Sequence, residues 1–436
     1  MRLLSLLLLT SLLAFPQKLN VRKHTLANGM SVIIHEDHDI PNVALYLFFK
    51  VGSRNERPGI TGLSHFFEHM MFNGARKYGP KQFDFFMENA GGNNNAYTSH
   101  DLTVYQDWFP RTALPLIFEL EADRLRDLAF DPKIVESERG VVYSERRTAI
   151  DNNPPGALNE QMMAAAFTAH PYHWPVLGWP SDIEGWTMAD LKQYWSMGYA
   201  PNNCILVVAG DVTESEILSL AKKHLEPIAR RSVPPPLKTI EPTQVGERRV
   251  LLEKPAQLPM VLIAYHTVES KHPDNNVITV LDSILTEGRS SRLYRRLVEQ
   301  DQVALNVGAQ AMQALDPGLW FVQVQPSAGI EPAKAEKAVY EELERLGKEP
   351  VTAAELETAK NQILAKFYRD MKTIAGKANF IGTFEIYQGD AGKIGEYPAT
   401  VQRVTAADIQ RVATKYLNAR NRTVATLVPV KEESAQ

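Results

Sequence analysis

The two halves of the sequence end with the same pattern, and this repeat most constrains the fold. Residues 187–191 precede Tyr199 and an apolar run, and residues 405–409 precede Tyr416 and a second apolar run at 424–428. With 436 residues, the chain exceeds the ~250–300 residues at which a single core stops growing. We therefore expect an α+β fold of two homologous domains, each a mainly antiparallel β-sheet flanked by α-helices.

A proline-rich run separates the two halves. It extends from Arg230 to Pro236 and ends in three successive prolines, which are stiff and cannot join a sheet. We expect an N-terminal domain over residues 18–228, a linker over 229–245 and a C-terminal domain over 246–436.

The N-terminus has the pattern of a secretory signal peptide. Arg2 precedes a mostly apolar run from Leu3 to Phe15, which is too short to span a bilayer comfortably. The alternative is a membrane-anchoring or core helix. We expect residues 1–17 to be removed, and the mature protein to be periplasmic or secreted from a bacterium, with no stable membrane span.

Composition excludes several classes of protein. The formal net charge is −4 and no block of Lys and Arg is long, so we expect no nucleic-acid partner. The single cysteine, Cys204, rules out an intramolecular disulfide and a cysteine-based zinc cluster. Cys204 lies in an apolar run, where we expect a small buried core residue.

Periodicity predicts most of the elements of the first half. Alternating apolar and polar residues, or short apolar runs, predict strands at 21–26, 31–35, 43–51, 94–99, 102–109 and 203–209. Asn28-Gly29 is expected to form a tight hairpin turn. Helical spacing predicts helices at 60–73, 80–90, 111–128, 132–151, 187–197 and 213–225. Asp131 and Pro132 are a typical N-cap and first position for the helix at 132–151.

The helix expected at 60–73 carries the residues most informative about function. His65 and His69 are four residues apart, so both imidazoles lie on one face and can share a zinc ion. Glu68 can reach the same side and accept a proton from water. A surface cluster of His and Glu is the alternative, but the apolar neighbours predict a buried helix, where unpaired charges are costly.

A catalytic zinc site takes three protein ligands and keeps one position open. Glu138 and Glu145 lie seven residues apart on the helix expected at 132–151, so both are on one face. Either carboxylate could complete the ligand set if that face meets the first helix.

Several motifs in order resemble the pitrilysin/insulysin metallopeptidases, over nearly the whole range 20–430. The resemblance is closest to the short members, such as mitochondrial processing peptidase and its bacterial relatives. The motifs are Leu26 to Gly29, Gly62 to Met70, Asn95 to Ser99, Glu138-Arg139 with Glu145, His170-Pro171-Tyr172, Asn202-Asn203 before the strand ending at Gly210-Asp211, and Glu287 to Leu293.

The resemblance implies roles for these residues. His65, His69 and Glu145 match the zinc ligands, one Zn²⁺ per chain, and Glu68 matches the general base. Glu138 matches a second carboxylate that supports the catalytic site. Asn95 and Ala96 match the strand edge where such enzymes pair a substrate peptide by β-addition. The C-terminal half has no H-x-x-E-H motif, so we expect no zinc site there.

The resemblance also implies a partner. The second half of the family normally carries an Arg followed by a Tyr that hold the substrate near the zinc, and here Val298 and Leu305 occupy those positions. Neither side chain can donate a hydrogen bond. We expect an endopeptidase for unfolded peptides that works as the catalytic subunit of a heterodimer, with a homologous zinc-free subunit supplying Arg and Tyr. The alternatives are family drift at these positions, and a non-catalytic scaffold or binding subunit of the same fold.

Overall fold

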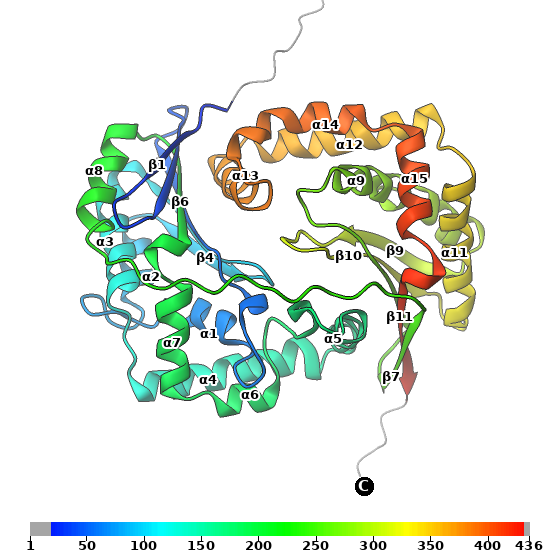
Figure 1. The fold of residues 1–436 in the computed structure, drawn as a ribbon, viewed down its shortest axis with the longest axis horizontal. Helices are drawn as coiled ribbons and strands as arrows, with labels where there is room; N and C mark the ends of the chain where they lie inside the picture. The colour runs from blue at the N-terminus through cyan, green and yellow to red at the C-terminus, as the bar shows by residue number, and fades with distance from the viewer. Residues whose placement is uncertain (1–18, 431–436) are drawn as a thin grey trace, which may run out of the picture.

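The computed structural model describes residues 19–430 and has two β-sheets with helices packed around them (Figure 1). The predicted signal peptide at 1–17 lies outside the described residues. Within the described range, no helix is both long and apolar enough to cross a membrane.

The first sheet has six strands in the order β1-β2-β6-β3-β5-β4. Only the β2–β6 pair is parallel. The strands are β1 (Arg22–Thr25), β2 (Ser31–Glu36), β3 (Asn42–Phe49), β4 (Asn93–Thr98), β5 (Thr103–Pro110) and β6 (Cys204–Gly210).

The second sheet has five strands in the order β7-β11-β8-β10-β9, and only the β7–β11 pair is parallel. If β1 is left out, the other five strands of the first sheet pair in the same way as the strands of the second. In each sheet, one parallel pair at the edge is followed by three antiparallel pairs. The expected α+β fold with a duplicated, mainly antiparallel sheet is therefore confirmed. The strands are β7 (Arg248–Pro255), β8 (Met260–His266), β9 (Ala304–Ala311), β10 (Leu319–Pro326) and β11 (Arg422–Val430).

The helices also recur in the two halves. The first half has α1 (Leu63–Met70), α2 (Gln82–Asn89), α3 (Leu114–Arg126), α4 (Pro132–Arg146), α5 (Pro154–Ala166), α6 (Pro180–Gly185), α7 (Met188–Gly198) and α8 (Glu214–His224). The second half has α9 (Pro273–Thr286), α10 (Arg292–Tyr294), α11 (Pro332–Lys348), α12 (Ala353–Asp370), α13 (Ile374–Tyr387), α14 (Tyr397–Arg403) and α15 (Ala406–Tyr416).

The sequence repeat at Thr187 and Thr405 has a structural cause. Each threonine caps the helix that leads to the parallel strand, α7 in the first half and α15 in the second. Each forms a reciprocal capping box with the aspartate three residues later, Asp190 or Asp408. The two halves therefore begin these helices in the same way.

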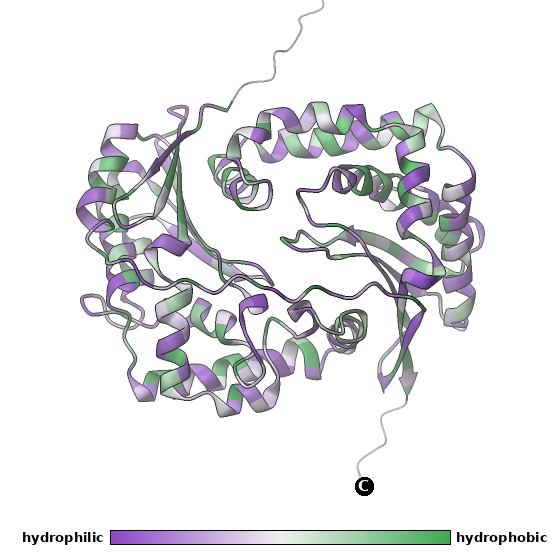
Figure 2. Ribbon diagram, viewed as in Figure 1, coloured by the Kyte–Doolittle hydropathy of each residue, from purple (hydrophilic) through white to green (hydrophobic). Residues whose placement is uncertain are grey.

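Two helices are exchanged between the halves. Helix α5 packs on β7, β8 and β11 of the second sheet, and α13 packs on β3 and β6 of the first. Strand β6 is consequently buried along its whole length, Cys204 included, and Figure 2 shows it as mostly hydrophobic. The chain between His224 and Arg248 has no helix or strand, but the core crosses this boundary because each half covers a sheet of the other.

The contact between α13 and β3 makes a testable prediction at Gly382. Alanine normally favours a helix interior over glycine by about 1 kcal/mol. Here a Cβ would lie 2.1 Å from the ring of the buried Phe48, and overpacking typically costs about 1–3 kcal/mol. Overpacking outweighs propensity, so Gly382→Ala should lower the free energy of unfolding measured by urea denaturation. Gly140→Ala is the control: Gly140 lies inside α4 with open space around it, and its replacement should be neutral or stabilising.

Candidate metal centre

Two residues fix the start of helix α1: Gly62, through its left-handed backbone conformation, and Glu56, through its buried carboxylate. Gly62 has φ 90°, and a Cβ there would lie 2.7 Å from the carbonyl oxygen of Leu177. The Glu56 carboxylate accepts hydrogen bonds from the backbone N–H groups of Gly62 and Ser64, both at 2.7 Å. Burial nevertheless raises the pKa of Glu56 to about 8. Glu56 was not expected from the sequence, because its contact with α1 is tertiary.

Helix α4 brings two carboxylates to the same side of α1. Asp131 accepts from the backbone N–H of Lys133 at 2.7 Å, and Pro132 is the first helical residue, as predicted. The α-helix ends at Arg146 and continues as one π-helical turn to Asp151, so it is regular through Glu145.

His65, His69 and Glu145 come together where α1 meets α4. Nε2 of His65 and Nε2 of His69 lie 3.6 and 3.2 Å from Oε2 of Glu145. The potential ligand atoms of the three residues all lie within 4.8 Å of one another, and within residues 19–430 no other such group of three occurs. Glu138 is outside the group.

The distances suit a metal better than hydrogen bonding. Two ligands of one tetrahedral zinc, each about 2.0–2.1 Å from it, are separated by about 3.3 Å. The two nitrogen–oxygen distances, 3.2 and 3.6 Å, bracket this value, and 3.6 Å is too long for a hydrogen bond. Two imidazoles and one carboxylate are a ligand set typical of catalytic zinc.

Glu138 lies behind His69 rather than among the three. Its Oε1 is 2.8 Å from Nδ1 of His69, and its Oε2 accepts from the Asn73 amide at 2.8 Å. A carboxylate in this position fixes the ring orientation and tautomer of a metal-binding histidine. The sequence gives no sign of this contact, since Asn73 is simply the last residue of the helix expected at 60–73.

The electrostatics of the group favour a cation. Burial opposes protonation of His69, but its hydrogen bonds to Glu138 and Glu145 outweigh burial and raise the pKa of His69 to about 9. The facing imidazoles of His65 and His69 hold the pKa of Glu145 well below its usual value. Two carboxylates around one imidazole therefore attract positive charge, which a proton or a divalent metal can supply.

Glu68 lies on α1 with the two histidines, and the edge strand of the first sheet contacts that helix. Glu68 is on α1 and is half-buried. Strand β4 contacts α1 and is the last strand of the sheet, so among the described strands one of its edges is unpaired. Asn95 is exposed, whereas Ala96 packs against the core of the first half. An extended peptide can pair with such an edge.

The second half presents Val298 and Leu305 differently. Val298 packs against the core of that half, and Leu305 is 52% exposed on β9. The neighbouring Arg292 makes two hydrogen bonds to Glu355, at 2.7 and 2.9 Å, and Arg296 pairs with Glu341 and Asp301. Both of these arginines are thus engaged within their own half.

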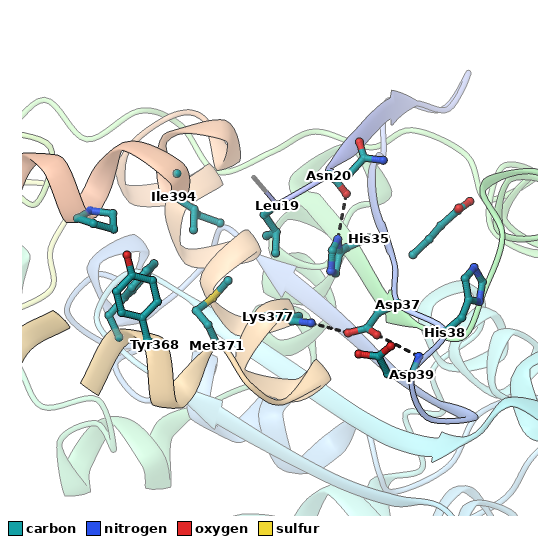
Figure 3. A pocket seen from close by; sticks show the side chains of 14 residues that line it. Leu19, Asn20, His35, Asp37, His38, Asp39, Tyr368, Met371, Lys377 and Ile394 are labelled. Atoms are coloured by element: carbon teal, nitrogen blue, oxygen red, sulfur yellow. Dashed lines mark hydrogen bonds and ion pairs between the residues drawn. The ribbon is translucent and has the colours of Figure 1, made fainter. Parts of the chain in front are cut away.

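A separate cavity of about 470 Å³ lies between the end of β2 and helices α12 and α13 (Figure 3). Leu19 and His35 line one side, Tyr368 and Met371 line the other, and an ion pair from Lys377 to Asp37 crosses the boundary between the halves. None of the residues of the metal group lines this cavity.

Comparisons with known proteins agree on one family. A family model described as insulinase (peptidase family M16) matches residues 31–178, and one described as the peptidase M16 inactive domain matches residues 185–363. The zinc protease PqqE of Helicobacter pylori is 30% identical over 93% of this chain and 92% of its own length. The probable mitochondrial-processing peptidase subunit beta of Schizosaccharomyces pombe is 29% identical over 90% of this chain and 88% of its own.

Solved structures have the same fold. The crystal structure of a protease from Helicobacter pylori superposes with a TM-score of 0.91 at 30% identity, covering 94% of this chain and 99% of that one. A structure titled peptidase M16 inactive domain, from Pseudomonas fluorescens, has a TM-score of 0.86 at 18% identity, with the same coverage.

Proposed function

The chain belongs to the insulinase family of peptidases, peptidase family M16, and from this premise we propose that it is a zinc-dependent endopeptidase that hydrolyses unfolded peptides in a closed chamber. The observation that carries the proposal is the convergence of His65, His69 and Glu145, together with a strand that contacts α1 and has one edge that no described strand pairs. Relatives named zinc proteases support both the metal and the reaction class.

Each residue has a defined task in this proposal. His65, His69 and Glu145 hold one zinc ion, which when bound acts as a Lewis acid that polarises the peptide carbonyl and acidifies water. Glu138 keeps the imidazole of His69 oriented through Nδ1. Glu68 takes a proton from the attacking water and delivers it to the leaving amine. Backbone pairing along Asn95 and Ala96 on β4 holds the substrate extended.

We further propose that the chain is the catalytic subunit of a heterodimer. Relatives named as beta subunits of mitochondrial-processing peptidases support a partner chain. Val298 and Leu305 lack the hydrogen-bond donors that a homologous zinc-free subunit would supply. Residues 1–17 support export to the periplasm or the medium. The competing function, a scaffold or binding subunit without activity, would leave the His and Glu residues of α1 without a chemical use.

The metal assignment is tested by measuring zinc and cleavage together. The purified protein should contain one zinc per chain, and a chelator should abolish cleavage of an unfolded peptide, with zinc restoring it. Glu145→Ala should lose zinc because it removes one of three ligands. Glu136→Ala is the control, since Glu136 is an exposed residue of the same helix outside the group. Retention of stoichiometric zinc by Glu145→Ala would overturn the ligand assignment.

A further inference from the structure

A second cavity lies between the two halves, away from the three candidate ligands. It has a volume of about 310 Å³, is open to solvent on one side, and is lined by the tip of the β4–β5 hairpin, by α5 and by strands of the second sheet. His100 contributes from the hairpin, Met163 from α5, and Met260, Met312 and Phe321 from β8, from the end of β9 and from β10. In Figure 1 the hairpin points toward α5 and β10.

The lining of this cavity combines apolar side chains with uncharged polar ones. Met163, Met260, Met312 and Phe321 form apolar walls, and methionine side chains adapt to ligands of different shape. Gln310 and Gln323, both exposed, also line it. None of the described residues that line it is Asp, Glu, Lys or Arg. Burial and the neighbouring His170 lower the pKa of His100 to about 4, so this ring is neutral at pH 7.

A polar network holds the cavity in shape by tying the hairpin to the loop between β9 and β10. Asp101 accepts from the backbone N–H of Leu315 at 2.9 Å and from the hydroxyl of Tyr172 at 2.7 Å. Arg54 forms an ion pair with Asp316, which also lies 3.1 Å from Nε2 of His170. The Met312 wall is thereby fixed relative to β4. The His170-Pro171-Tyr172 motif thus has a structural use that the metal group does not explain.

The cavity lies at the hairpin tip where β4 ends, and the proposed function assigns β4 to substrate pairing. His100 follows the last residue of β4, Thr98, by two positions. An extended peptide advances about 3.3 Å per residue, so a peptide paired with β4 passes the hairpin tip within a few residues. Its side chains alternate between faces, and one of them is presented to the cavity.

We propose that this cavity is a specificity pocket that accepts a bulky uncharged side chain, aliphatic or aromatic, of the bound peptide at a position several residues from the cleaved bond. The inference rests on the proposed function, because it takes β4 as the site of substrate pairing. A Lys, Arg, Asp or Glu side chain would lose hydration here without gaining a charged partner, so peptides carrying one at this position bind less well.

The experiment is a positional scan on a peptide that the protein cleaves. Each position outside the cleaved bond is replaced in turn by Phe, Leu, Lys and Glu, and kcat/KM is measured with the full chain and its partner subunit where cleavage requires it. The wild type should prefer Phe and Leu over Lys and Glu by about tenfold at one remote position. Gln310→Glu should change the Lys-to-Glu preference at that position by about five- to tenfold.

Gln313→Glu is the matched control. It adds the same charge by the same isosteric change three residues away, on an exposed side chain that lines a different cavity with Thr279 and Phe380. It should leave the preference unchanged. A scan without such a preference, or an equal response to both variants, overturns the pocket.

A binding measurement separates this inference from the proposed function. Fluorescence anisotropy with the same peptides measures their binding affinity, and so tests the pocket independently of cleavage. If peptides bind with the expected preference but are never cleaved, the pocket stands and the peptidase proposal fails. If the peptides are cleaved but kcat/KM does not depend on the residue at any remote position, the peptidase proposal stands and the pocket is rejected. If the peptides are neither bound nor cleaved, both the pocket and the peptidase proposal are overturned.

Discussion

The Glu68→Gln variant should keep its zinc and lose peptide cleavage by a factor of ~10²–10⁴. The amide is nearly isosteric with the carboxylate but cannot accept a proton from water. Glu68 is half-buried on α1 and outside the group of three proposed ligands, so its replacement leaves the metal in place. The measurement is zinc content by elemental analysis together with kcat/KM on an unfolded peptide.

Glu138→Gln separates proton transfer from support of the metal site. It weakens the interaction with Nδ1 of His69 without touching the proposed base. Loss of such an outer carboxylate typically costs about 10–100-fold in metal affinity or activity. Zinc affinity should therefore fall in Glu138→Gln and stay unchanged in Glu68→Gln. Cleavage at the parental rate by Glu68→Gln would show that another group acts as the base.

The sequence specified the local parts of the site better than its surroundings. His65 and His69 are brought to one face by helical periodicity alone, and Asp131-Pro132 marked the start of α4 correctly. Periodicity could not separate Glu138 from Glu145, because residues seven apart share a helix face. The family resemblance implied Glu145 as the ligand and Glu138 as the supporting carboxylate. In the structure, the packing of α4 on α1 brings Glu145 to both histidines and leaves Glu138 behind His69.

The sequence patterns did not predict contacts between segments that are far apart in the chain. Glu56 precedes α1 in an irregular segment, and nothing in its neighbours indicates that it caps the helix. The exchange of α5 and α13 was also missed, because neither helix was predicted and a helical pattern would not reveal which sheet the helix covers. The repeat was recognised because capping boxes and apolar strands are local signals.

A homologous subunit that carries the Arg and Tyr expected of the family, but no H-x-x-E-H motif, should raise kcat/KM of this chain by about 10²–10³, the usual effect of one well-placed transition-state donor. The chain alone should bind zinc and cleave poorly. Among the nearby arginines of its own second half, Arg292 and Arg296 are held in ion pairs with acidic residues of that half. Arg295 is exposed, but it lies three residues before Val298, which packs against the second core, and so it is on another face of the helix. The measurement is kcat/KM on an unfolded peptide as the partner is titrated in.

Mixing variants identifies which chain performs the chemistry. The partner combined with Glu68→Gln should remain inactive, because the partner contributes no base and no zinc ligands.

The missing donors can also be introduced into the chain itself. Leu305→Tyr should be well tolerated, since Leu305 is 52% exposed on β9. Val298→Arg carries a packing cost, since Val298 contacts the second core. Full activity of the purified chain without any partner would contradict the heterodimer and would mean that another donor replaces the Arg and Tyr.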